Sequence, residues 1–134
     1  MTQTQTRYQL STRLAIPAEQ ALPKVLAALK AEGFGVLFNL DMKAILKQKL
    51  DVDYRPYWVL GACNPPLAYQ ALQTEPDIGL MIPCHVVVAE DEGNTVVSLI
   101  DPVTALGIIG NPGLDDIATE VRNRFQRVIS ALNA

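Results

Sequence analysis

The side chains with the most distinctive chemistry in this sequence are two thiols and one imidazole. Cys63 and Cys84 are the only cysteines of the chain, and His85 is its only histidine. Two thiolates and an imidazole are suitable ligands for a soft metal ion, whereas two neighbouring thiols without a metal could cycle to a disulfide. Free cysteine is also among the most buried residue types, so a structural role for both thiols stays open.

Asn64 follows the first cysteine directly and adds an amide to the candidate site. It precedes Pro65 and Pro66, an arrangement typical of a helix N-terminus. Free backbone N–H groups at such an end favour anions, although each proline lacks one, and capping of the helix would by itself explain the asparagine. We predict a ligand-binding site at Cys63, Asn64 and Cys84, with Cys63, Cys84 and His85 as metal-ligand candidates and the cofactor unknown.

Two features of the sequence limit this site. Successive side chains of a strand point to opposite faces, so Cys84 and His85 are not expected to share one ligand shell. The spacing of the cysteines does not resemble paired C-x-x-C knuckles, and no G-x-S-x-G, P-loop, H-E-x-x-H or dinucleotide fingerprint occurs. Catalytic residues stay unknown, and the sequence favours binding over enzymatic catalysis.

Composition bounds the class of protein. With 134 residues, 49% of them hydrophobic, the chain fits one domain over residues 1–134, in which residues 1–7 are a flexible segment or lead into a strand. A net charge of −3 argues against nucleic acid as a partner. No apolar run approaches the roughly 20 residues of a membrane span, and residues 1–8 lack the features of a secretory signal. We therefore expect a cytoplasmic protein with no membrane partner.

Hydrophobic periodicity predicts the elements that must position these residues. A strand is expected at residues 8–16, followed by a helix from Pro17 to Gly33 with a late start or a kink at Pro23. Next come a strand at 35–40, a short helix at 41–50, a strand at 57–62 and a helix from Asn64 that closes at 74–77. The chain then forms a hairpin of 84–90 and 95–100, an irregular connection after Asp101-Pro102, and a helix at 114–132. This order is not strict βαβ alternation. It predicts an α+β fold in which helices cover one face of a mainly antiparallel sheet.

Several segments of the chain resemble a bacterial family known as Domain of Unknown Function 302. The resemblance rests on Gly61–Pro66 (GACNPP), Glu75–Cys84 (EPDIGLMIPC), Gly33–Val36 (GFGV), Asp101-Pro102 and the C-terminal helix. It implies an α+β fold with a strand, a helix, four further strands and a helix, commonly paired as a homodimer. It implies no activity and no catalytic residues, because the family has none established. One departure is His85, where family members often have Asn.

Three functions follow as hypotheses. The first is a homodimeric binding or sensing domain with a small-molecule or metal site near the two cysteines. The second is a thiol-dependent redox enzyme that uses Cys63 and Cys84, which requires a thiol pKa well below the roughly 8.5 of free cysteine. The third is a structural interaction module that holds a partner through exposed apolar surface.

Overall fold

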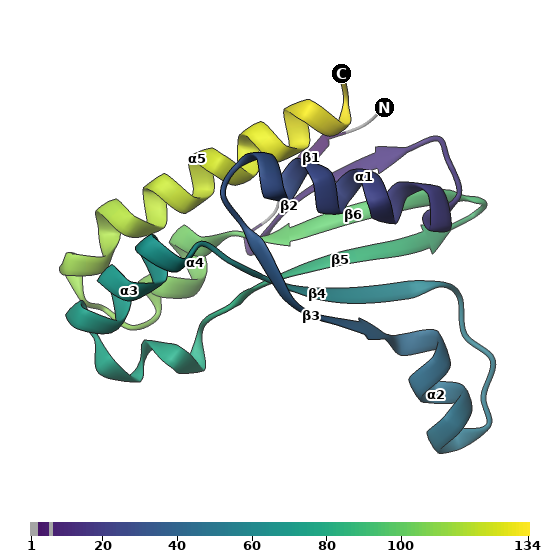
Figure 1. Cartoon of the computed structure of the whole chain (residues 1–134), viewed down its shortest axis with the longest axis horizontal. Coiled ribbons are helices and arrows are strands. Elements are labelled where there is room, and N and C mark those ends of the chain that lie inside the picture. Colours follow the sequence, from purple (N-terminus) through teal and green to yellow (C-terminus); the bar gives the residue numbers. More distant parts are fainter. Residues whose placement is uncertain (1–2, 6) are drawn as a thin grey trace.

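The computed structural model describes residues 3–5 and 7–134. Residues 1, 2 and 6 of the predicted N-terminal segment lie outside this range. Across the described residues, an antiparallel sheet has the strand order β1-β2-β6-β5-β4-β3 (Figure 1). The strands are β1 (Gln3–Gln5), β2 (Gln9–Leu14), β3 (Gly35–Asp41), β4 (Tyr57–Cys63), β5 (Cys84–Asp91) and β6 (Asn94–Ile100).

The helices confirm the predicted α+β class. They are α1 (Ala18–Ala31), α2 (Met42–Leu50), α3 (Pro65–Thr74), α4 (Pro102–Gly107) and α5 (Asp115–Leu132), with the 3-10 turns η1 (Pro76–Leu80) and η2 (Pro112–Leu114). The long helices α1 and α5 contact each other and lie across the same face of the sheet (Figure 1). In the part of the chain that is described, no helix is long and apolar enough to cross a membrane.

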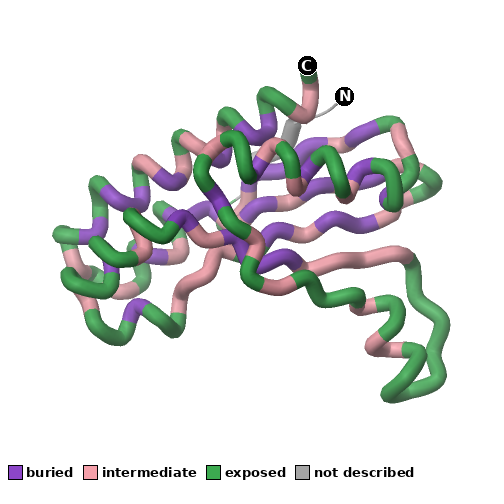
Figure 2. The backbone as a smooth tube through the Cα atoms, viewed as in Figure 1, coloured by how far each residue is buried: buried purple, intermediate pink, exposed green. Residues whose placement is uncertain are grey.

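The core lies between this sheet face and the two long helices (Figure 2). Alternation along the strands directs Leu60 of β4 and Val86 of β5 toward the helices, and both are fully buried. Phe125 of α5 is also fully buried, and its ring lies 4.9 Å from that of Phe34. The predicted apolar stripe of α5 is confirmed, since its members from Ile117 to Ile129 are buried.

Helix α1 begins at Ala18 and keeps Pro23 in its interior, so the late start expected there is wrong. Pro23 is exposed, and the carbonyl that its missing N–H would have bonded can be hydrated. The predicted end at Gly33 is confirmed. Gly33 has φ +86°, and the N–H of Phe34 donates to the Leu29 carbonyl at 3.0 Å in a Schellman arrangement.

Helix α2 forms where the sequence predicts it, but it does not pack on the core. Asp41 caps it by accepting a hydrogen bond from the Ala44 N–H at 2.9 Å. None of its residues is buried, and Leu50 is 66% exposed. The helix and the connection that follows it project beyond the ends of β3 and β4 (Figures 1 and 2).

The sequence analysis did not predict the short elements α4, η1 and η2. The chain from Pro102 is helical rather than irregular, because Asp101 caps α4 by accepting from the Val103 N–H at 3.0 Å and also pairs with Arg122 of α5 at 3.2 Å. The turn η1 precedes β5. These elements and α3 form a second apolar cluster around Ile78 and Leu114 at one end of the sheet.

Candidate functional site

The candidate site lies where β4 ends, α3 begins and β5 starts. Cys63 is the last residue of β4, Asn64 caps α3, and Cys84 is the first residue of β5. Ala62 and Cys84 are directly paired across the two strands. The register therefore places the two cysteines on adjacent rungs of the ladder, although 21 positions separate them in the sequence. Alternation assigns Cys84 to the face of Ala62 and assigns Cys63, the last residue of β4, to the opposite face.

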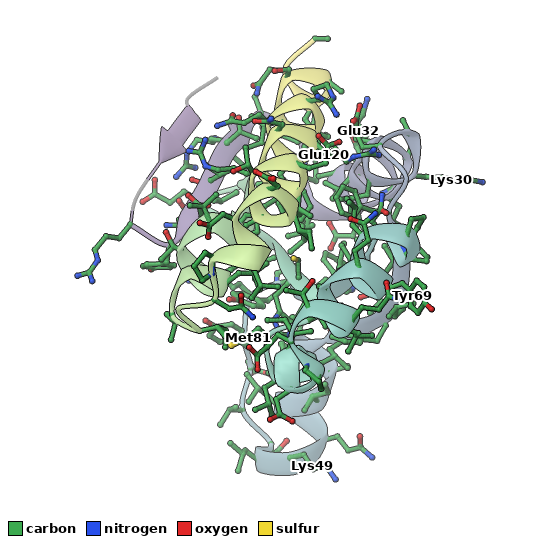
Figure 3. All side chains as sticks on the ribbon, turned by 90° about the vertical axis from the view of Figure 1, so that its left-hand side faces the viewer. Lys30, Glu32, Lys49, Tyr69, Met81 and Glu120 are labelled. Carbon is green, nitrogen blue, oxygen red and sulfur yellow. The ribbon has the colours of Figure 1, made fainter. Side chains whose placement is uncertain are left out.

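All three predicted ligand-binding residues line one cavity. Its volume is about 40 Å³. Apart from these residues, apolar side chains line it from the connection before β3, from α3, α4 and α5, and from the connection before β5, among them Phe34, Ala71, Ile82, Leu106 and Val121. Figure 3 looks onto this end of the molecule, where Tyr69 of α3 points away into solvent. The cavity thus joins the sheet core to the second apolar cluster.

The size of this cavity restricts what could occupy it. A water molecule needs about 10–15 Å³ of such space, so 40 Å³ holds an ion or a very small molecule. Sites for metabolites and cofactors are commonly about 300–1,000 Å³. Without a rearrangement of its walls, this cavity does not accommodate a nucleotide or a sugar.

Burial controls the chemistry of the two thiols. It raises the pKa of Cys84 to about 12, with a smaller contribution from the neighbouring Cys63. Burial also raises the pKa of Cys63, whose sulfur lies less deeply among protein atoms. Both thiols are therefore neutral at pH 7 in the free protein. Neither has the lowered pKa of a nucleophilic cysteine.

Asn64 is 8% exposed and has two roles within the site. Its Oδ1 accepts from the Leu67 N–H at 3.2 Å, which confirms the predicted cap and fixes the orientation of the amide. Its Nδ2 group donates no hydrogen bond to any residue that the structure describes. Because no buried side-chain polar atom of the described residues lacks a partner, this amide nitrogen is in contact with solvent.

Gly33 lies close to both that amide and the Arg124 guanidinium, and sequence reasoning did not find this arrangement. A Cβ atom at Gly33 would lie 2.9 Å from the Asn64 Nδ2 and 3.2 Å from the Arg124 Nη1. Arg124 is held there by donating from Nη1 to the Glu32 carbonyl at 2.8 Å and from Nε to Glu120 at 2.7 Å. In the sequence, Arg124 and Glu120 form an ordinary i,i+4 helix pair, so no local pattern links them to Asn64.

His85 lies on the other face of the sheet, as alternation predicts. Its ring is 5.8 Å from that of Phe38, and it lines a hollow with Tyr57 and Ser98. The structure therefore brings together Cys63, Asn64 and Cys84 and separates His85 from them. Over the described residues, no group of three or more His, Cys, Asp or Glu side chains is arranged to hold a metal ion.

Comparisons with known proteins agree with this fold. The family described as "Domain of unknown function DUF302" matches residues 10–132. The chain is also similar to a crystal structure of an uncharacterized conserved DUF302 protein from Bacillus stearothermophilus. The two share 26% sequence identity over 96% of this chain and 98% of the other, with a TM-score of 0.84. No curated protein matches the chain.

Proposed function

We propose that this chain, which belongs to the DUF302 family of unknown function, is a binding or sensing domain whose ligand occupies the cavity between Cys63, Asn64 and Cys84. One observation carries the proposal. The fold brings both cysteines of the chain and the buried Asn64 to the lining of one small cavity, although the sequence separates them. A concave, mostly apolar surface with a few polar groups is the usual form of a ligand site.

The free Nδ2 group of Asn64 supports this proposal independently. No buried side-chain nitrogen or oxygen of the described residues lacks a hydrogen-bond partner, so the Nδ2 group reaches solvent and is available to a ligand acceptor. Asn64 could cap α3 equally well as Ser, because only Oδ1 is used for capping. The asparagine therefore carries a donor that the fold itself does not use.

A thiol-dependent redox enzyme is the weaker alternative. Such an enzyme needs a thiolate near neutral pH, which requires a thiol pKa below the ordinary value. Burial raises the pKa of both cysteines. A binding role does not require free thiolates, because a ligand can either accept from the thiols or displace their protons.

The open face of the sheet supports a homodimer as the working form. Outward positions of β4, β5 and β6 carry apolar side chains that are only partly buried, namely Tyr57, Val59, Val87, Val96 and Ile100. Exposed antiparallel sheets usually carry polar residues on the solvent side. We take a second copy of the chain as the occupant, because two-fold symmetry packs the same face of both copies together. The outward charges of Arg13 and Asp91 are already neutralised by their ion pair within one copy, so they do not oppose this packing.

Native mass spectrometry of protein purified without oxygen or reductant tests the binding site. We expect a retained mass that disappears in Cys63→Ser and Asn64→Ser but persists in the matched control His85→Ala. Asn64→Ser keeps a capping oxygen, so loss of the mass would report the missing donor rather than unfolding. A retained mass that persists in both the Cys63→Ser and the Asn64→Ser variants would contradict the proposed location. A disulfide between Cys63 and Cys84, together with turnover of a thiol substrate, would favour the redox enzyme.

Light scattering tests the dimer separately. Val87→Glu places a charge at the centre of the open face, where we expect it to convert a dimer into a monomer. Gln70→Glu adds the same charge to the exposed surface of α3 and should leave the dimer intact. A dimer that survives Val87→Glu would mean that the copies meet elsewhere.

A further inference from the structure

We propose that the arm of one copy, residues 42–56, docks on the acidic end of a second copy, which is formed by α3, η1, η2 and the first turn of α5. The two surfaces lie at opposite ends of β4, because the arm precedes Tyr57 and α3 follows Cys63 (Figure 1). The 7 residues of β4 span roughly 20 Å, so the arm does not reach the acidic end of its own chain. This contact rests on the homodimer proposed above and adds to it a surface outside the open face.

The arm exposes apolar side chains that the fold leaves uncovered. Leu50, Val52 and Tyr54 are all exposed, and no residue of α2 is buried. Single exposed apolar residues are ordinary, but these three occupy alternate positions of a short segment that projects from the body (Figure 2). Such a group is suited to burial against another protein surface.

The arm is also basic. Its four basic residues outnumber its two aspartates, and Lys47 forms ion pairs with both aspartates, at 2.9 and 3.4 Å. Among the described residues, Lys43, Lys49 and Arg55 belong to no ion pair. The Arg55 guanidinium lies 5.1 Å from the centre of the Tyr54 ring, so positive charge and apolar surface are adjacent. The arm therefore fits a surface that is both acidic and apolar.

The end of the molecule around α3 has the complementary charge. Between Arg55 and Arg122 the chain contains no lysine or arginine, but it contains nine acidic residues. Three of these, Asp77, Asp115 and Asp116, are exposed and belong to no ion pair in the described part of the chain. They lie at one end of the molecule because α3 contacts η1, η2 and α5. This acidic end can therefore attract a basic segment.

Apolar side chains are exposed on the same elements. Tyr69 and Leu72 of α3 are exposed, and Leu80 of η1 is 87% exposed. Figure 3 shows Tyr69 pointing outward from α3, and Lys49 pointing outward from the arm. In a single copy both apolar groups face solvent. Contact between two copies would cover both groups and would bring opposite charges together around them.

Two-fold symmetry favours a second copy as the occupant. Every copy carries one arm and one acidic end, so a two-fold dimer forms the contact twice. Arg55 also lines a hollow of the open face together with Tyr57 and Val87, so the arm is continuous with the face proposed to pair. When two such faces pack with their strands antiparallel, the arm of each copy lies toward the acidic end of the other.

Charge reversal on one surface at a time tests this contact. The arm variant carries Lys43→Glu and Lys49→Glu, and the acidic-end variant carries Asp77→Lys, Asp115→Lys and Asp116→Lys. Each variant alone opposes like charges, so sedimentation velocity at low salt should give a dimer dissociation constant at least about tenfold above that of the wild type. An equimolar mixture of the two variants should associate again, because each arm then meets an end of opposite charge.

Matched variants separate this effect from net charge. Lys24→Glu with Lys30→Glu on the exposed surface of α1 changes the net charge as the arm variant does, and should leave the dissociation constant within about twofold of the wild type. Salt at about 1 M, where the Debye length is about 3 Å, should narrow the difference between the arm variant and the wild type. Leu50→Ser should weaken association even at that salt concentration. Circular dichroism establishes that each variant is folded.

The outcomes separate this proposal from the previous ones. If the charge variants associate as the wild type does, or if their mixture associates no better than each alone, the arm contact is wrong. The open-face dimer then stands if Val87→Glu gives a monomer. A monomeric wild type would end both the dimer and the arm contact, while the mass retained at the cavity tests the binding site by itself. A monomer that binds phosphatidylserine vesicles, and loses this binding in the arm variant, would assign the arm to an anionic membrane instead.

Discussion

Cys84 and His85 are neighbours in the sequence and belong to two different regions of the molecule. Cys84 faces the helices and lines the small cavity beside α3, whereas His85 is exposed on the open face of the sheet. The same ladder of hydrogen bonds holds both residues, so the difference comes only from the alternation of side chains along β5.

The two regions also differ in the space that they offer. Hollows of about 250 and 330 Å³ lie on the open face, compared with about 40 Å³ in the cysteine cavity. The two larger hollows share Tyr57, Val87 and Ser98. A broad, partly apolar face of this kind suits another protein surface.

Truncation of two adjacent residues of β4 should give the largest contrast between the faces. Leu60→Ala removes a fully buried side chain from the helix-covered face and should lower the free energy of unfolding by about 2–5 kcal/mol. Val59→Ala acts on the partly exposed open face and should cost about 1 kcal/mol or less in dilute solution. Denaturant titration measures both. If Val59→Ala costs as much free energy of unfolding as Leu60→Ala, and this cost grows with protein concentration, a second copy of the chain buries the open face.

Above about pH 9, the free energy of unfolding should depend on the ionisation of Cys84. Its pKa is raised from 9.0 to about 12 in the folded chain, so the neutral thiol favours the native state below pH 9. Above that pH the unfolded chain ionises first, and stability should fall by up to about 1.4 kcal/mol per pH unit until the folded thiol also ionises. Cys84→Ala should remove this part of the slope between pH 9 and 11. An unchanged slope would mean that the thiol is not desolvated.

The open face itself contains one tight contact, which Gly61→Ala would disturb. A Cβ atom at Gly61 would lie 2.4 Å from Cε2 of the Phe38 ring, so the ring must move away from its place beside His85. We expect a loss of about 1–3 kcal/mol in the free energy of unfolding. In a Phe38→Ala background the same substitution should cost much less. A full cost in that background would assign the effect to the β4 backbone.

The smallest effect should come from the cap of α3. Asn64→Ala removes the acceptor of the Leu67 N–H and should cost about 1 kcal/mol, whereas Asn64→Ser should stay within about 0.5 kcal/mol of the wild type. Thermal unfolding distinguishes them. If both variants lose the same stability, the Nδ2 group has a structural role at Gly33, and the argument for a free donor weakens.

Strong local signals explain what could be predicted. The apolar stripe of α5, the Gly33 terminus, the capping Asn64 and the hairpin around Gly93 each depend on residues close together in the sequence, and the structure confirms them. Helix α4 was missed because its six residues are stabilised by the Asp101–Arg122 contact with α5 rather than by a periodic pattern. The apolar face of α2 was recognisable, but its exposure was not.

The sequence by itself determined the family, the α+β class and the separation of Cys84 from His85, because a strand alternates its side chains wherever it is placed. Only the tertiary structure decided that Cys63 and Cys84 share one cavity, that this cavity is too small for a metabolite, and that Arg124 approaches Asn64. These relations join β4, β5, α3 and α5. They depend on strand register and helix packing, which no local run of residues encodes.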